Sequence, residues 1–391
     1  MRYVPRELER QVLKAVNGFP AVVLTGPRRA GKTWLLRRLF PHAAYFLLED
    51  PDLVARLRAD PQAFLDGVKT PVILDEVQHV PEVFAFVRSR IDRQPRRTGQ
   101  WLLTGSQEAP LMQSVSESMA GRAAVLQLYP LSARETPKVT LLRGGYPEVV
   151  ARPAGAQLWF ASYLQTYLER DVRAVTAVKD LATFRRFLAL VASRHGQMLN
   201  KTDLAAPLGV SVPTITQWLG VLEMTAQILV VPPFYENFGK RLIKSPKVYL
   251  ADSGLACHLL GIDSAAELTK SPFAGSLFEG LIASEIVKAQ VNAGRRREIY
   301  HFRDEQGLEV DFVTPGPGGS LTLVECKAGR TVTPAMAAPM QRLRDAVTKA
   351  RRKHSAVTMC LVHQTLKGRN PTSAVAPGVQ ALPWRDFLRK L

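Results

Sequence analysis

The sequence predicts an α/β protein with an N-terminal parallel sheet that carries helices on both faces, a helical middle part and a second α/β part at the C-terminus. Between residues 21 and 128, short apolar runs alternate with segments of helical periodicity, which is typical of strand–helix–strand units. From residue 155 to 234 the pattern is helical, and strand-like runs return after residue 298. We therefore expect three domains, at residues 1–154, 155–250 and 251–391.

Each expected element follows from its local pattern. The first is a helix within residues 1–20, with Leu8, Val12, Leu13 and Val16 on one face. The expected strands of the first domain are 21–25, 45–48, 72–75, 100–104 and 124–128, and its further helices are 32–40, 51–65 and 83–90. The expected helices of the middle part are 158–174, 181–193, 201–208 and 213–224. The last part is expected to hold helix 277–290 and strands 298–303, 308–314 and 320–326, with a Pro-Gly hairpin turn at 315–319.

The composition favours a polyanionic partner. Among 391 residues, 52 are Lys or Arg and 34 are Asp or Glu, which gives a formal net charge of +18. Such an excess favours nucleic acid as a partner, although a generally basic surface is the alternative. No apolar run is long enough to span a membrane, and the N-terminus lacks the apolar core of a signal peptide. We therefore expect a cytoplasmic protein with no membrane contact. The three widely spaced cysteines fit no zinc pattern and are expected to be reduced thiols.

A nucleotide site is predicted directly after the first strand. Residues 26–33 read Gly-Pro-Arg-Arg-Ala-Gly-Lys-Thr, a complete match to G-x-x-x-x-G-K-[ST] between a strand and a helix. Backbone N–H groups of such a loop surround phosphates, Lys32 reaches the β- and γ-phosphates, and Thr33 holds Mg²⁺. ATP and Mg²⁺ are therefore the expected cofactors. The expected nucleotide-binding residues are Gly26, Pro27, Arg28, Arg29, Ala30, Gly31, Lys32, Thr33 and Trp34.

Further catalytic residues are expected at the ends of two later strands. Residues 71–76, Pro-Val-Ile-Leu-Asp-Glu, place two carboxylates at the carboxyl edge of the sheet beside the loop. Asp75 is expected to bind Mg²⁺ through water, and Glu76 to polarise the attacking water. Thr104 or Ser106, at the end of a further strand, is expected to contact the γ-phosphate or that water, unless it only caps the strand.

Two arginines are candidates for an arginine finger that reaches the nucleotide of a neighbouring subunit. Arg122 follows a glycine in a polar stretch, and Arg170 lies in Tyr-Leu-Glu-Arg-Asp. A surface or ion-pair role is the alternative for each.

The middle part contains a helix-turn-helix pattern at residues 201–224. Helix 204–208 is followed by a turn at 209–211 and a second helix at 213–222, with Ser211 as its cap. Ile215, Leu219 and Leu222 form the expected buried face of the second helix, and Thr214, Thr216 and Gln217 the outward face that would meet a major groove. Residues 228–232 are the expected wing. The alternative is a winged helix used only for packing. Nearby basic residues that could touch phosphates are Arg185, Arg186, Arg194 and Lys201.

A second candidate site lies in the C-terminal hairpin. Strand alternation lets Asp311, Glu325 and Lys327 come together across the Pro-Gly turn. Two carboxylates can hold Mg²⁺, and the lysine can orient or activate a hydrolytic water. Basic residues flank this hairpin, at 295–297 before it and at 349 and 351–353 after it, and suit a phosphate backbone.

Several segments resemble known families. GPRRAGKT, PVILDEVQHVPE, LLTGSQ and GRAAVLQLYPLSARE, with the later GGYPEVV, YLERDV and YLADSGL, are similar to AAA+-superfamily ATPases of bacteria and archaea that carry a C-terminal domain of unknown function. That resemblance covers nearly the whole chain and implies an AAA+ module, a winged-helix middle and a nuclease-like C-terminal domain.

The C-terminal pattern of Asp311 followed by Glu325 and Lys327 resembles the restriction-endonuclease-like PD-(D/E)xK nucleases, in which Glu279 fits an extra acidic position and Gln341 a polar one. Val310 stands where that family usually has Pro. An active nuclease, a DNA-binding domain that does not cut and a purely structural domain all stay open.

The combined expectation is an ATP-hydrolysing, DNA-binding protein that remodels or processes duplex or branched DNA in repair, recombination or defence. We expect a homo-oligomer, with a hexameric ring as one arrangement. The alternative is a nucleotide-switch ATPase that acts on a protein partner and carries an inactive nuclease-like domain.

Overall fold

The computed structural model describes residues 3–105, 118–168, 181–234, 243–329, 331–350, 356–364 and 374–391. The chain forms two compact units. The first consists of Met1–Leu131, Gly220–Gln227 and Val291–Arg295, and the second of Ser132–Leu219, Ile228–Gln290 and Arg296–Leu391. The expected domain boundaries near residues 154 and 250 stay predictions.

The first unit contains the parallel sheet that the sequence predicts. Its strands are β1 (Ala21–Thr25), β2 (Ala44–Leu47), β3 (Val72–Asp75), β4 (Trp101–Thr104) and β5 (Ala123–Gln127). They lie in the order β2-β3-β4-β1-β5, and all neighbours pair in parallel. Because β4 lies between β1 and β3, the chain segments that follow these three strands emerge side by side at the carboxyl edge of the sheet.

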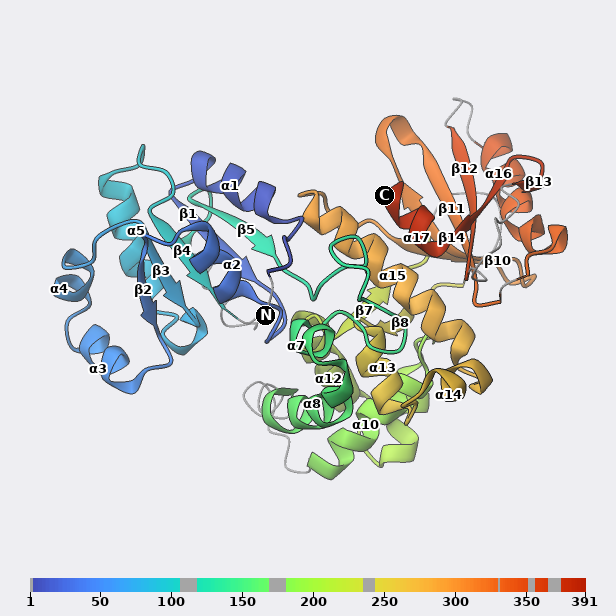
Figure 1. Ribbon diagram of the computed structural model, residues 1–391, viewed down its shortest axis with the longest axis horizontal. Coiled ribbons are helices and arrows are strands. Elements are labelled where there is room, and N and C mark those ends of the chain that lie inside the picture. Colours follow the sequence, from blue (N-terminus) through green and yellow to red (C-terminus); the bar gives the residue numbers. More distant parts are fainter. Residues whose placement is uncertain are drawn as a thin grey trace. The chain divides into compact units, whose positions relative to one another are not determined.

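Helices cover both faces of this sheet (Figure 1). One face packs against α1 (Glu9–Gly18) and α2 (Lys32–Leu39). The other packs against α3 (Pro51–Ala59), α4 (Pro61–Asp66) and α5 (Val83–Arg93). Alternate residues of β1 supply the two cores, since Val22 and Leu24 face one and Ala21 and Val23 the other. The predicted α/β class is confirmed.

Two local expectations for this unit are wrong. The single helix expected at 51–65 is divided into α3 and α4, because the Asp60 side chain accepts a hydrogen bond from the Ala63 N–H and caps a new helix that begins at Pro61. Leu13 does not share the buried face of Leu8 and Val12, since 45% of its surface is exposed.

The second unit begins with short helices and a small antiparallel sheet. The helices before this sheet are α7 (Pro147–Ala151), α8 (Ala156–Tyr163) and α10 (Leu181–Ser193), and those after it are α13 (Ser253–Leu259) and α14 (Ala265–Lys270). The sheet contains β6 (Gln197–Met198), β7 (Ile228–Val231) and β8 (Lys247–Leu250) in the order β6-β8-β7. Of the helix expected at 158–174, the part up to Tyr163 is α-helical and belongs to α8, and a π-helical turn follows at Leu164–Leu168. The last residues of the expected helix lie outside the described part of the chain.

The two helices of the helix-turn-helix pattern are present. They are α11 (Lys201–Ala205), extended by a 3₁₀ turn at Ala206–Leu208, and α12 (Val212–Met224). The Ser211 hydroxyl accepts a hydrogen bond from the Thr214 N–H at 3.2 Å, so the predicted cap forms. Ile215, Leu219 and Leu222 are buried as expected. Thr216 and Gln217 are exposed, whereas Thr214 is half-buried. Contact of this helix with DNA stays a prediction.

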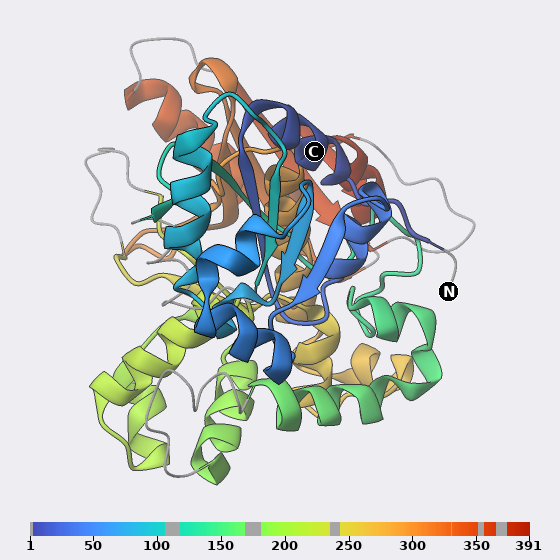
Figure 2. The same ribbon diagram turned by 90° about the vertical axis from the view of Figure 1, so that its left-hand side faces the viewer.

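The C-terminal part of the second unit is built on a six-stranded mixed sheet, seen from two sides in Figures 1 and 2. Its strands are β9 (Tyr300–Arg303), β10 (Glu309–Pro315), β11 (Leu321–Lys327), β12 (Val357–His363), β13 (Ala374–Ala376) and β14 (Val379–Pro383), in the order β13-β14-β12-β11-β10-β9. Its helices are α15 (Ala274–Asn292), α16 (Ala338–Ala350) and α17 (Trp384–Arg389). The predicted hairpin of β10 and β11 is antiparallel, whereas β11, β12 and β14 are parallel.

A buried carboxylate connects the two segments GGYPEVV, at residues 144–150, and YLADSGL, at residues 249–255. Asp252 accepts hydrogen bonds from the N–H groups of Gly145, Gly254 and Leu255, at 2.7, 2.9 and 3.0 Å. It therefore caps α13 and anchors the chain that leads into α7. Gly144 has a φ of +66°, and a Cβ atom on it would lie 2.0 Å from an Asp252 carboxylate oxygen.

We predict that Gly144→Ala destabilises the protein by more than the ~1–3 kcal/mol that left-handed backbone strain costs on its own, because the added Cβ also collides with Asp252. Gly261→Ala is the matched control, since Gly261 has a φ of +69° and a Cβ atom added there would have nothing within 4 Å. Thermal unfolding of the two variants measures the difference. Equal unfolding midpoints would show that Asp252 moves aside without cost.

Candidate functional site

The loop between β1 and α2 has the backbone that phosphate binding requires. Gly26 and Gly31 have φ values of +139° and +97°, a region that favours glycine. A Cβ atom on Gly26 would lie 2.1 Å from the Leu128 carbonyl oxygen, so only glycine fits there. The buried Lys32 ammonium donates hydrogen bonds to the carbonyls of Gly26 and Pro27, both at 3.0 Å. Lys32 thus lies across the loop whose N–H groups would surround a phosphate.

Asp75 gathers three hydroxyl groups at the carboxyl edge of the sheet. Its carboxylate accepts hydrogen bonds from Thr33 Oγ1 at 2.9 and 3.1 Å, from the Tyr45 hydroxyl at 2.8 Å, and from Thr104 Oγ1. The structure therefore brings Thr33, Asp75 and Thr104 together, as the sequence led us to expect. Tyr45, on β2, is an addition that no motif marked. Burial and the neighbouring Asp75 raise the pKa of Tyr45, so its hydroxyl keeps its proton and acts as a donor.

Glu76 is held at the mouth of this site in an unusual conformation. Its φ and ψ are +57° and +45°, the left-handed region that non-glycine residues rarely adopt. Its carboxylate accepts a hydrogen bond from Gln78 Nε2 and lies 4.0 Å from the Arg28 guanidinium, while its N–H donates to Thr104 Oγ1 at 3.4 Å. Such local strain is typical of functional positions.

The donor set beside the loop fits Mg²⁺. Thr33 and Asp75 offer a hydroxyl and a carboxylate, the hard oxygen ligands that this ion prefers. Thr33 and Asp75 are therefore the residues that would hold Mg²⁺.

The N-terminal segment is a part of this region that sequence reasoning missed. The buried Arg6 guanidinium donates hydrogen bonds to the carbonyls of Ala30, in the loop, at 3.0 Å and of Tyr129 at 2.6 Å. The Tyr3 ring stacks on Trp34, with centroids 5.2 Å apart, and the Arg38 guanidinium lies 5.4 Å from the Tyr3 ring centroid. Trp34, directly after Thr33, is nevertheless 55% exposed.

Of the two candidate arginine-finger residues, the structure describes only Arg122. Arg122 donates hydrogen bonds to both carboxylate oxygens of Asp92, at 2.6 and 3.1 Å, so it forms an ion pair within its own chain. This pairing raises the pKa of Arg122 and lowers that of Asp92. A role toward a neighbouring subunit stays a prediction. Ser106 and Arg170 lie outside the described residues.

The second candidate site is a cluster of carboxylates in the C-terminal part. Asp311 on β10, Glu325 on β11 and Glu279 on α15 interact electrostatically. An Asp311 carboxylate oxygen accepts a hydrogen bond from the Cys326 N–H at 2.7 Å, and Lys327 donates to Glu325 Oε1 at 2.6 Å. The four residues predicted from the sequence pattern therefore belong to one neighbourhood. Gln341 instead donates to the Pro377 carbonyl at 3.3 Å.

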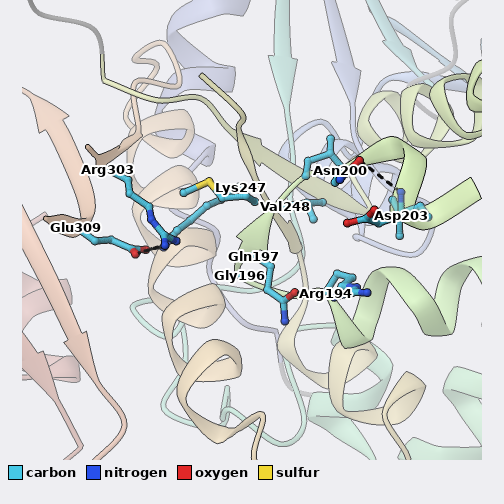
Figure 3. Close-up of a pocket in the computed structure, with 12 residues that line it drawn as sticks. Arg194, Gly196, Gln197, Asn200, Asp203, Lys247, Val248, Arg303 and Glu309 are labelled. Carbon is cyan, nitrogen blue, oxygen red and sulfur yellow. Dashed lines mark hydrogen bonds and ion pairs between the residues drawn. The ribbon is translucent and has the colours of Figure 1, made fainter. Parts of the chain in front are cut away.

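A lysine that the sequence did not mark enters this cluster from β8. The Lys247 ammonium lies 2.8 Å from Glu279 Oε1, 2.7 Å from Glu309 Oε1 and 4.0 Å from Asp311 Oδ1, and its side chain is only 3% exposed. Figure 3 shows Lys247 extended toward Glu309. Tyr249, two residues later on β8, also donates to Glu279 Oε1. Lys247 was missed because its partners are distant in the sequence and belong to no motif.

Burial and mutual repulsion set the protonation of these groups. Burial raises the pKa of Asp311 well above its usual value, and Glu279 and Glu325 add to the rise. Burial likewise raises the pKa of Glu325, although Lys327 opposes it. For Lys247, burial lowers the pKa, but the carboxylates of Glu279, Asp311 and Glu309 outweigh it, so the net shift is upward and the ammonium stays charged.

These residues fit a divalent cation only in part. Glu325 Oε2 is buried without a hydrogen-bond partner, as expected of a ligand atom. In the described part of the chain, however, no group of three or more His, Cys, Asp or Glu side chains is arranged to hold a metal ion. The Lys247 ammonium already pairs with Glu279 and lies near Asp311. With Lys247 in this position, the cluster does not fit a metal.

A cavity of about 340 Å³ adjoins Lys247 (Figure 3). Its volume is at the lower end of the range for small-molecule sites. It is lined by Arg194, Gly196, Gln197, Met198, Leu199, Asn200, Asp203, Leu204, Lys247, Val248, Arg303 and Glu309.

Comparisons with known proteins agree with the N-terminal site. Residues 18–136 match a family model described as an AAA domain. Residues 134–266 and 274–383 match two domains of unknown function, DUF8612 and DUF4143. The chain is 32% identical over 344 residues to the uncharacterized proteins Mb2031c of Mycobacterium bovis and Rv2008c of Mycobacterium tuberculosis, which covers 86% of this chain and 76% of each relative. The chain belongs to their family. Residues 18–136 are thus a P-loop domain of the AAA type.

The solved structures that were matched have lower sequence identity to this chain than these relatives have. The Walker-type ATPase PABY2304 of Pyrococcus abyssi is 16% identical, with a TM-score of 0.41 over 65% of this chain and 94% of that chain. The DNA clamp loader delta protein (YqeN) of Bacillus subtilis is 13% identical, with a TM-score of 0.24 over 55% of this chain and 88% of that chain.

Two further expectations concern the whole chain. Within the described ranges, no helix is both long enough and apolar enough to cross a membrane. Cys257, Cys326 and Cys360 are buried free thiols, as predicted.

We predict that Trp34→Ala weakens ATP binding at least ~5-fold, because Trp34 directly follows Thr33, is 55% exposed and would offer its ring to the base, and stacking on an aromatic ring contributes about 1–3 kcal/mol. Binding of tripolyphosphate, which has no base, should not change. Titrations of both ligands test this, with Trp34→Phe as the control that keeps an aromatic face. Equal weakening for both ligands would show that Trp34 supports only the loop.

Proposed function

We propose that this protein hydrolyses ATP with Mg²⁺ at the site in its first unit and uses the reaction to remodel or process DNA. The observation that supports hydrolysis is the Asp75 carboxylate, which lies with Thr33 and Thr104 beside the phosphate loop and next to Glu76. The proposal is supported because the two residues that would hold Mg²⁺, the polar Thr104 and the proposed base Glu76 lie at one edge of the sheet.

Each residue has a proposed role. Lys32 leaves the loop carbonyls and binds the β- and γ-phosphates, while loop N–H groups surround the phosphate oxygens. Mg²⁺ held by Thr33 and Asp75 would neutralise charge on the phosphates. Glu76 orients and polarises the attacking water. The Thr104 hydroxyl positions both acidic residues, because it accepts a hydrogen bond from the Glu76 N–H and donates one to the Asp75 carboxylate.

The proposal of DNA as the partner is supported by charge. The formal net charge is +18, and exposed basic residues occur on α10, directly after it and just beyond the end of α15. These residues are Arg185, Arg186, Arg194, Arg295 and Arg296. The outward face of α12, with Thr216 and Gln217, is available to a groove. We propose duplex or branched DNA as the substrate, for repair, recombination or defence in the cytoplasm.

A homo-oligomer, with a hexameric ring as one form, is part of this proposal. A finger role for Arg122 would require it to leave Asp92 and reach a neighbouring nucleotide.

One observation favours the second function, a nucleotide switch that acts on a protein partner. Lys247 pairs with Glu279 inside the carboxylate cluster, so the nuclease-like site resembles a structural ion-pair network. In that case the C-terminal part would be inactive as a nuclease, and DNA would not affect the ATPase.

We predict that ATP hydrolysis is stimulated by one form of DNA among linear duplex, single strand and a four-way junction, and that Lys32→Ala abolishes hydrolysis in every case. Binding of that DNA should weaken steeply with salt, because log K falls by ~0.9 per neutralised phosphate and per log unit of salt. If no DNA form changes the rate and no salt-dependent binding occurs, the nucleotide-switch function is favoured.

We predict that Glu76→Gln lowers the rate constant for ATP hydrolysis by about 10²-fold or more, because a positioned general base contributes that much to a rate. ATP binding should persist, since Glu76 is not among the phosphate-binding residues, whereas Lys32→Ala should weaken binding. Single-turnover hydrolysis and equilibrium binding separate the two effects. Unchanged hydrolysis in Glu76→Gln would assign the base to another group.

A further inference from the structure

One ammonium group lies among three carboxylates in the C-terminal part. Lys247 Nζ lies 2.8 Å from Glu279 Oε1 and 2.7 Å from Glu309 Oε1, with Asp311 Oδ1 at 4.0 Å. Asp311 and Glu325 are themselves buried, and each lies close enough to other carboxylates for the charges to repel. Carboxylates buried in one cluster are stabilised by a cation among them or by a bound proton, because their repulsion is not screened by water.

The cation is supplied from outside the hairpin that carries the nuclease-like pattern. Lys247 belongs to β8, in the small sheet with β6 and β7, whereas Asp311 and Glu325 lie on β10 and β11. Lys327, the lysine of the pattern, pairs with Glu325 instead, at 2.6 Å. Lys247 is therefore an additional cation beside the carboxylates that a divalent metal would use.

One carboxylate oxygen of this cluster has no hydrogen-bond partner. Glu325 is 6% exposed, and its Oε2 has no hydrogen-bond partner, although Lys327 satisfies Oε1. A buried carboxylate oxygen without a partner is costly, and a role in binding an ion is one established reason for it. This atom takes no part in the Lys247 contacts and would be available to a bound cation.

The cavity beside Lys247 offers the ammonium a second position. Lys247, Glu309 and Arg303 line it (Figure 3), and the Glu309 side chain is 32% exposed. A turn of the flexible lysine side chain into the cavity would keep its contact with Glu309 and release Glu279 and Asp311. The ammonium would then stay paired with Glu309, whereas Glu279 and Asp311 would lose their cation and would need a divalent ion in its place.

We propose that Lys247 is a built-in cation that keeps the Glu279–Asp311–Glu325 cluster closed to divalent metal, and that the cluster becomes a divalent-cation site when the ammonium leaves it. The inference builds on the proposed DNA-directed function, since it identifies what controls the nuclease-like site. It does not depend on ATP hydrolysis.

The test is Mn²⁺ binding to the full chain without nucleotide, measured by the loss of the free-ion electron paramagnetic resonance signal. Lys247→Met should gain a site at least about tenfold tighter than any that the unsubstituted protein shows, a difference of about 1.4 kcal/mol. The added site should disappear in the double variant Lys247→Met/Asp311→Asn, which separates it from metal bound near Asp75. Lys247→Arg, which keeps the positive charge, should gain no site.

Folding is followed in the same variants by thermal unfolding with and without Mn²⁺. Lys247→Met should unfold at a lower temperature than the unsubstituted protein without metal and recover with Mn²⁺, whereas Lys247→Arg should respond no more than the unsubstituted protein does. Lys247→Gln, which keeps polar contacts, is a second neutral variant if Lys247→Met does not fold.

Three outcomes would overturn the proposal. The first is a folded neutral variant without an Asp311-dependent Mn²⁺ site, and the second is an equally tight site in the unsubstituted protein. The third is failure of both neutral variants to fold even with Mn²⁺, which would make Lys247 an ion-pair partner that metal cannot replace. Because ATP hydrolysis is measured separately in Lys247→Met, failure of this inference is distinguishable from failure of the proposed function.

Discussion

The N-terminal site depends on the position of β4 between β1 and β3. This order places the phosphate loop, Thr104 and the pair of Asp75 and Glu76 at adjoining strand ends, so that one carboxylate can accept hydrogen bonds from hydroxyls on three different elements. Without β4 in between, neither Thr104 nor the left-handed turn at Glu76 would have its present partner. The Gly26 contact with Leu128 extends the same constraint to β5, because a side chain there would separate the loop from the sheet.

The sequence predicted what depends on local pattern. The phosphate loop, the strand that ends in Asp75 and the hairpin of β10 and β11 are contiguous segments whose residue types are dictated by backbone conformation and strand alternation, and each was located correctly. The point at which one helix ends and the next begins was harder to predict, as Asp60 shows. Asp60 is recognised as a cap only once Pro61 is known to begin a new helix rather than to lie within one.

The residues that sequence reasoning missed act across long separations. Arg6 reaches Ala30 and Tyr129, Tyr45 reaches Asp75, and Lys247 reaches Glu279 and Glu309. Each is a common residue type in an ordinary local setting, and its function follows only from what the fold places beside it. A buried arginine or lysine is nevertheless rarely without a partner, so such residues become informative as soon as burial is known.

The two carboxylate sites differ in how their charge is stabilised, and this difference has a functional consequence. Asp75 is held by neutral hydroxyls of Thr33, Tyr45 and Thr104, which leave its negative charge available to a metal that arrives with a nucleotide. Glu279 and Asp311 instead lie beside the ammonium of Lys247, a cation that belongs to the chain itself. A divalent ion can add to the first arrangement, but it must displace a charge from the second. We therefore propose that the first site is open to Mg²⁺ without rearrangement, whereas the second requires a prior movement of the Lys247 side chain.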